Sequence, residues 1–147
     1  MEIPVYVTVE EVKRVCGELK ISDWTQLTEG KVSPGEAELI LKWVNTEGMD
    51  IPLDDFRRGL EVELEHGTRF RDANVTNNHP LLTGKIVLAH LKESMDYYKR
   101  LEVAEIEGDI LKAMVRKDMD KVQRLHKELV KARLELSESE WKELGGE

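Results

Sequence analysis

The chain has 147 residues, of which 40% are hydrophobic and 35% are charged, and its net charge is −8. This length suits one ordinary domain, and an aromatic content of 5% with many charges fits a soluble helical protein better than a β-sandwich. The negative charge argues against broad nucleic-acid binding. A single cysteine, Cys16, excludes an internal disulfide framework.

The N-terminal segment, residues 1–11, has neither the basic start nor the apolar core of a signal peptide. No apolar run in the chain reaches the 18 or so residues of a membrane span. We therefore expect a cytoplasmic protein with no membrane attachment. Residues 1–7 alternate loosely between apolar and polar, which indicates a short strand or an extended arm.

Two helix starts are marked by capping sequences. Thr8-x-x-Glu11 is a capping box and predicts a helix that runs to about Lys20. Ser33-Pro34-Gly35-Glu36 has the same spacing with proline at the first helical position, and the helix that it opens should end by Gly48. We expect Trp43, in this second helix, to lie in the core.

A third helix is predicted from Pro52 or Asp54 to Gly67, followed by a polar loop to Asn78. Asn78 is the expected N-cap of a fourth helix, with Pro80 just inside it. No proline interrupts the chain from there to about residue 115, so the fourth helix is predicted to be long.

The last predicted helix, about residues 119–136, carries apolar residues at heptad-like spacing. Ser137-x-x-Glu140 should then cap a short terminal turn. The apolar stripe must pack on the fourth helix or on a second copy of the chain, so helices around 80–136 are a candidate homodimer surface. The stripe consists of Val122, Leu125, Leu129, Ala132 and Leu136.

Charge is unevenly distributed. Residues 112–133 contain eight Lys or Arg against three Asp or Glu, which gives about +5 locally and leaves about −13 on the remainder. This basic stretch contains no interleaved aromatic residues, so we interpret it as a solvated face or as a surface for acidic groups of a partner.

Together these elements predict an all-α fold: a small bundle of about five helices with a long fourth helix and a C-terminal helical hairpin extension. The expected organisation is a helical domain at residues 1–115, with 21–50 as an insertion. Residues 116–147 would form an extension that packs on the same domain or on a second copy.

The most site-like feature is a mirrored pair of motifs, Glu63-x-x-His66 on the third helix and His90-x-x-Glu93 on the fourth. Residues three apart share a helix face, and two helices joined by a short loop normally pack antiparallel. Carboxylates and imidazoles from facing helices hold Zn²⁺, Fe²⁺ or Mn²⁺ in helical bundles. The motifs therefore predict a divalent metal site.

Asp96 and Tyr97 are candidates for supporting groups beside those four ligands. The alternative is that Glu63 and His90 form one buried polar pair that keeps two helices in register, in a non-enzymatic interaction or assembly module. His66 is closer to the loop than His90 by roughly 10 Å along the axes, so Glu63 with His90 is the expected contact and His66 the weakest member.

The chain carries no phosphate-binding glycine loop, no Ser/His/Asp signature and no zinc-type cysteine cluster. The sequence thus indicates no particular reaction, and whether the protein is an enzyme stays open.

The middle of the chain resembles a bacterial, archaeal and phage family known only as a domain of unknown function. The resemblance is carried by FRRGLEVELEHGT (56–68), NVTNNHPLLTGKIVLAHLKE (74–93) and DYYKRLEVAE (96–105), and by the opening TVEEVKRVCGEL (8–19). Asn78-His79 stands where that family tends to carry two Asp, and Ser94-Met95 stands where it has Phe-Pro. Without that proline, the fourth helix is expected to continue unbroken.

The resemblance implies no activity. It does imply that several polar residues on helix faces belong to a common pattern, which favours a metal or polar site over a purely apolar core. These residues are Glu63, Glu65, His66, Thr83, Lys85, His90, Glu93, Asp96 and Tyr97.

Overall fold

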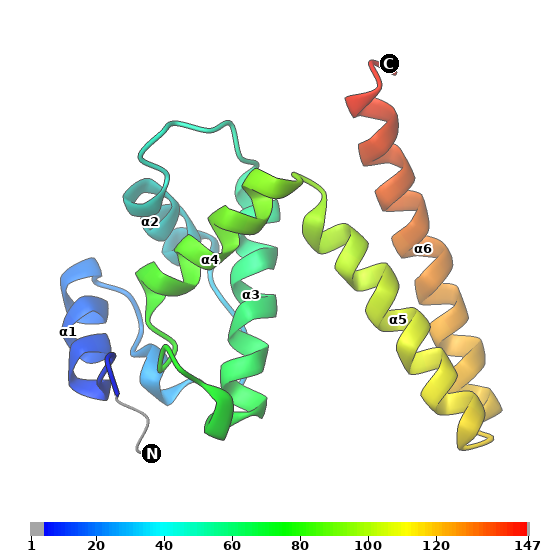
Figure 1. Ribbon diagram of the computed structural model, residues 1–147, viewed down its shortest axis with the longest axis horizontal. Helices are drawn as coiled ribbons and strands as arrows, with labels where there is room; N and C mark the ends of the chain where they lie inside the picture. The colour runs from blue at the N-terminus through cyan, green and yellow to red at the C-terminus, as the bar shows by residue number, and fades with distance from the viewer. Residues whose placement is uncertain (1–4, 147) are drawn as a thin grey trace. The chain divides into compact units, whose positions relative to one another are not determined.

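The computed structural model describes residues 5–146, and every regular element among them is a helix (Figure 1). The all-α prediction is confirmed. The contacts group the chain into a first unit that ends at Glu93 and a second unit that begins at Ser94. The strand or arm expected at residues 1–7 falls partly outside the described residues, and residues 5–7 form no strand.

The first unit contains α1 (Val9–Leu19), α2 (Pro34–Val44), α3 (Leu53–Arg69) and α4 (Pro80–Glu93). Helices α2, α3 and α4 pack against one another, and α1 contacts α4 and a short 3₁₀ helix at Trp24–Gln26. The segment 21–50, expected as an insertion, contributes to this core. The residues that are fully buried include Val12, Trp24, Ala37, Ile40, Phe56, Leu60 and Val87.

Both predicted helix starts are confirmed. The Thr8 hydroxyl accepts a hydrogen bond from the Glu11 amide, and Ser33 with Glu36 forms a complete capping box. The Glu36 carboxylate also accepts bonds from the backbone and hydroxyl of Ser22. Burial would raise the pKa of Glu36, but the bonds from Ser22 and Ser33 outweigh it and lower that pKa to about 2. One carboxylate therefore ties the preceding loop to the start of α2.

Helix α4 lies unusually close to α2 because of Gly84. A Cβ atom at this position would stand 2.6 Å from Cγ2 of Ile40 and 3.2 Å from Cγ1 of Val44, with Phe56 of α3 next in range. Those three side chains are buried. The absence of a side chain at Gly84 thus allows the backbone of α4 to rest directly on the apolar surface of α2 and α3.

The prediction of one long fourth helix is wrong. The chain breaks between Glu93 and Tyr97, and α5 (Tyr97–Val115) is a separate helix. At the break, the Asp96 carboxylate accepts hydrogen bonds from the Ser94 hydroxyl and from Nε of Arg100. Short polar side chains that bond locally compete with helix continuation, so Ser94 and Asp96 end the helix without a proline.

Three further expectations at helix ends and faces are wrong. Helix α6 (Met119–Glu143) is continuous, so Ser137-x-x-Glu140 begins no new turn. Trp43 is 63% exposed, because the buried face of α2 is made by residues at positions 37, 40 and 44. Asn78 does not cap α4, since the residue that precedes Pro80 is His79.

The second unit is a hairpin in which α5 and α6 lie antiparallel and side by side (Figure 1). The predicted heptad stripe of α6 includes the buried residues Leu129 and Ala132, and α6 packs on α5, which occupies the second half of the predicted fourth helix. An ion pair of 2.6 Å joins Arg133 of α6 to Glu107 of α5. Among residues 5–146, no helix is both long enough and apolar enough to cross a bilayer.

The close approach at Gly84 can be tested by Gly84→Ala. The added methyl group overlaps Ile40, so we expect a loss of about 1–3 kcal/mol in the free energy of unfolding. Gly17→Ala in α1 is the matched control, since a Cβ there meets nothing within 4 Å, and it should stabilise by about 0.5–1 kcal/mol. Urea unfolding of both variants measures this. Equal stability of the two would contradict the packing argument.

Candidate functional site

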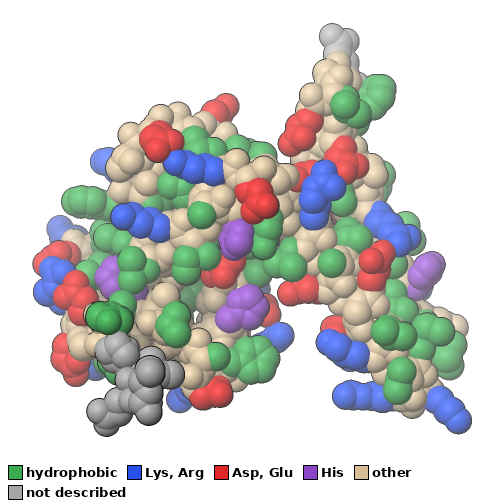
Figure 2. Space-filling view, in the orientation of Figure 1, with side chains coloured by type: hydrophobic (Ala, Val, Ile, Leu, Met, Phe, Trp, Pro, Cys, Tyr) green, Lys and Arg blue, Asp and Glu red, His purple; other side chains and the backbone are tan. Residues whose placement is uncertain are grey.

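The packing of α4 on α3 brings three of the four predicted motif residues, Glu63, His66 and His90, together in the first unit. Nε2 of His90 lies 3.6 Å from Oε1 of Glu63. Nδ1 of His66 lies 3.9 Å from Oε2 of the same carboxylate. Glu63 thus has one imidazole nitrogen opposite each of its two oxygens. Figure 2 shows histidine side chains next to acidic ones over α3 and α4.

These three side chains differ in their contact with water. The Glu63 side chain is 16% exposed, that of His90 is 31% exposed and that of His66 is 63% exposed. A carboxylate so far withdrawn from water needs polar partners to offset its desolvation. The predicted contact between Glu63 and His90 is therefore present, and His66 remains in reach from the solvent side.

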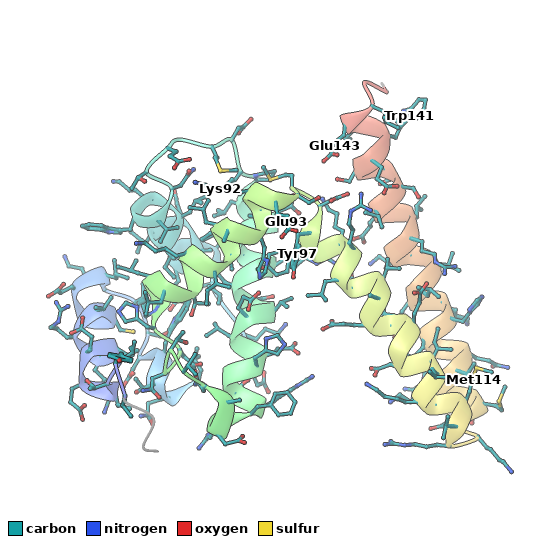
Figure 3. The ribbon with its side chains drawn as sticks, viewed as in Figure 1. Lys92, Glu93, Tyr97, Met114, Trp141 and Glu143 are labelled. Atoms are coloured by element: carbon teal, nitrogen blue, oxygen red, sulfur yellow. The ribbon has the colours of Figure 1, made fainter. Side chains whose placement is uncertain are left out.

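The other predicted residues lie further along the chain. Glu93 is exposed and is the last residue of α4 (Figure 3). Asp96 and Tyr97 belong to the second unit. There the Asp96 carboxylate is buried and lies 2.7 Å from an Arg100 nitrogen, while the ring of Tyr97 meets that of Tyr98 edge to face. Desolvation opposes ionisation of Asp96, yet the bonds from Arg100 and Ser94 lower its pKa.

A small hollow of about 120 Å³ adjoins Glu63 and His66. Polar side chains at its wall include Thr76 and Thr83, of which Thr83 is buried. The space is large enough for a few water molecules or a small group, and Glu63 and His66 lie at its edge.

The loop between α3 and α4 is held by three asparagines. Nδ2 of Asn74 donates to Oδ1 of Asn78 and to the Gly67 carbonyl, at 2.9 and 3.3 Å. Asn78 donates in turn to the Trp24 carbonyl, and Asn77 donates to that of Val7. A Cβ at Gly67 would stand 2.0 Å from Oδ1 of Asn78. This network fixes the loop against α3 beside the site.

His79 begins α4 by an unusual cap. Its Nδ1 accepts a hydrogen bond of 3.3 Å from the Leu82 amide, and its ring is buried. An accepting nitrogen carries no proton, so this cap requires the neutral ring. Burial lowers the pKa of His79, although the nearby charge of Glu11 acts in the opposite direction.

Comparison with known proteins gives one family. A model described as a protein of unknown function, DUF5661, matches residues 12–107, well over half of the chain. The chain belongs to the DUF5661 family. No curated protein and no solved structure matches it. The DUF5661 match contains every predicted site residue, from Glu63 to Tyr97, and it ends within α5.

Within residues 5–146 of this DUF5661 protein, no three His, Cys, Asp or Glu side chains are arranged closely enough to hold a metal ion as they stand. The arrangement of Glu63, His66 and His90 is instead that of a shared carboxylate with two imidazoles. The carboxylate can accept one hydrogen bond from each imidazole or, after small side-chain rotations, the three side chains can present ligand atoms to one ion.

Sequence reasoning missed the asparagine network and the capping role of His79. The run NVTNN (74–78) was a usable signal, because asparagine tolerates positive φ better than other residues with a side chain. Asn77 and Asn78 have φ values of 48° and 60°. Asn77 and Asn78 turn the chain so that the next residue, His79, becomes the N-cap of α4.

The cap makes stability depend on pH through His79. The folded state lowers the pKa of this ring below its ordinary 6.5, so the unfolded chain takes up the proton more readily. The stabilisation is complete above that value and is lost as the pH falls through the folded pKa. Urea unfolding between about pH 7.5 and about pH 5 measures this loss.

His79→Asn is the control, since the asparagine side chain does not titrate and caps helices at both neutral and acid pH. The variant should keep its stability at neutral pH and show a smaller fall in acid than the parent chain. His79→Ala should lose about 1 kcal/mol at neutral pH. A parent chain and a His79→Asn variant with the same pH profile would refute the role of His79.

Proposed function

We propose that this DUF5661 protein binds a divalent transition-metal ion through Glu63, His66 and His90 on the facing surfaces of α3 and α4. The observation that carries the proposal is the position of one carboxylate between two imidazole nitrogens, 3.6 and 3.9 Å away. Glu93 is a further candidate ligand, and Asp96 and Tyr97 are candidate supporting groups.

The distances fit this chemistry. Imidazole nitrogen and carboxylate oxygen bind Zn²⁺ at about 2.0–2.2 Å. Two such ligand atoms at tetrahedral angles stand about 3.4 Å apart. The separations at Glu63 exceed this by only a few tenths of an ångström, so the proposal requires the side chains to rotate by a small amount.

The ligand types favour Zn²⁺, Fe²⁺ or Mn²⁺, since carboxylate and imidazole ligands suit all three. The hollow beside Glu63 and His66 leaves room for water in the remaining coordination positions. We assign no reaction to the site.

A second candidate function is an interaction or assembly module in which Glu63 and His90 hold α3 and α4 in register. The exposure of His66 and the solvent-facing position of Glu93 favour this alternative. In that case the pair acts through its hydrogen bonding and charge, whatever ions are present.

Metal analysis of protein purified without an affinity tag tests the proposal. We expect about one ion per chain and a rise in melting temperature when Zn²⁺, Fe²⁺ or Mn²⁺ is added, because an ion that binds the folded state stabilises it. Glu63→Gln and His90→Ala should abolish both effects. His126→Ala removes an exposed histidine of α6 and should leave both unchanged.

His66→Ala distinguishes a true ligand from a bystander, since it should weaken metal binding while Glu63 and His90 retain contact. Protein that carries no metal and melts at the same temperature with each ion would overturn the metal site. The assembly alternative would then predict that His90→Ala lowers the free energy of unfolding by about 1–3 kcal/mol in metal-free buffer.

A further inference from the structure

The hairpin of α5 and α6 buries little of its own apolar surface. Within the described part of this unit, four apolar or aromatic side chains are buried: Tyr98, Ala113, Leu129 and Ala132. Twice as many large hydrophobic side chains are exposed. They are Leu111, Met114, Val115, Met119, Val130, Leu134, Trp141 and Leu144. Helices owe most of their stability to the packing of an apolar face, so this hairpin lacks much of the contact that it needs.

The exposed apolar residues gather on one broad face. At about 100° per residue, Val130, Leu134 and Trp141 of α6 fall within about 40° of one another. Val130 follows the buried residue Leu129 by about 100° around α6, and Met114 follows the buried residue Ala113 by the same angle around α5. Because the two helices are antiparallel, these two positions lie on the same side of the hairpin. Leu111 lies further round α5 in the same direction. Figure 2 shows hydrophobic side chains gathered near the turn of the hairpin, and in Figure 3 Trp141 projects away from α5.

The other flank of the hairpin is charged, by the same helical geometry. No comparable set of large apolar residues lies there among the described positions. Charged residues on this flank of α6 are Lys121, Arg124, Glu128, Lys131 and Glu135. One side of the hairpin is therefore suited to water and the other to a protein surface.

Charge also divides along the length of the hairpin. The half next to the turn, residues 107–133, has eight Lys or Arg against five Asp or Glu, a net charge of +3. The opposite half, residues 94–106 and 134–146, has three against seven, a net charge of −4. A hairpin with opposite charges at its two ends is complementary to a reversed copy of itself.

We propose that a second copy of the chain covers this apolar face. The two hairpins pack face to face with the basic turn of each against the acidic end of the other, which forms a four-helix bundle about a twofold axis. Val130, Leu134 and Trp141 lie in the contact. The proposal does not depend on metal binding in the first unit.

The size of the face fits a stable dimer. Helix α5 has 19 residues and is about 28 Å long. Two helices about 10 Å apart present a surface about 20 Å wide, hence a face of about 600 Å². Two such faces bury about 1,200 Å² in total, which is the lower end of the range of standard protein interfaces.

Light scattering and sedimentation of the full chain test the proposal. We expect twice the 16.9 kDa of one chain. Leu134→Glu should raise the dissociation constant at least about tenfold, because it buries a charge in the contact. Leu134 is exposed in the single hairpin, so the helical circular dichroism signal should persist. Arg124→Gln changes the net charge equally at an exposed site on the charged flank of α6, and it should change dimerisation less than twofold.

Salt tests the orientation of the two copies. Opposite ends in contact attract, so raising the salt concentration should weaken the dimer. If the dimer instead becomes stronger as salt is added, ends of like charge are in contact. That result would overturn the arrangement in which the basic turn of each hairpin contacts the acidic end of the other. A monomer at about 0.1 mM overturns the proposal itself. If Leu134→Glu then lowers the melting temperature, the chain's own first unit covers the face, and if the monomer binds anionic vesicles, a membrane surface covers it.

Discussion

The close approach at Gly84 is the constraint on which the first unit depends. Because position 84 has no side chain, α4 rests on Ile40 and Val44 of α2 and on Phe56 of α3. This contact sets the distance and register of α4 along α3. It therefore decides that His90 faces Glu63, which α3 presents at the margin of the same apolar core. An apolar contact on one side of α4 thus positions the polar contact on the other.

The loop that leads into α4 also fixes the position of this helix, but through hydrogen bonds. Gly67 admits the side chain of Asn78, and the chain turns at two residues with positive φ before His79 caps the helix. The loop is therefore anchored at three places: the Gly67 carbonyl in α3, the Trp24 carbonyl and, through His79, the Leu82 amide in the first turn of α4. His66 follows Glu63 by three residues within α3, so the helix itself keeps this exposed side chain near the Glu63 carboxylate.

The elements that could be predicted from sequence were those with a periodic or capping signal of their own. The capping sequences at Thr8 and Ser33 are local signals, and both appear as expected. The break at Asp96 was missed because it depends on a side chain that prefers Arg100 and Ser94 to a continuing helix. Trp43 was misassigned because α2 has apolar residues on both sides, and only the packing partners decide which side is buried. Contact between Glu63 and His90 followed from two helical faces, whereas the asparagine network required tertiary structure.

The break at Ser94–Asp96 divides the chain into two units that differ in packing and charge. The first unit has a core of its own and a partly buried carboxylate between two imidazoles. The second unit consists of two long paired helices with few buried side chains, and its two ends carry opposite net charges. The DUF5661 match ends within α5, so the family pattern includes the whole Glu/His arrangement but only part of the hairpin. The proposed metal binding is thus what we expect relatives to share, while the proposed self-association through α6 depends on residues beyond that match and can differ between them.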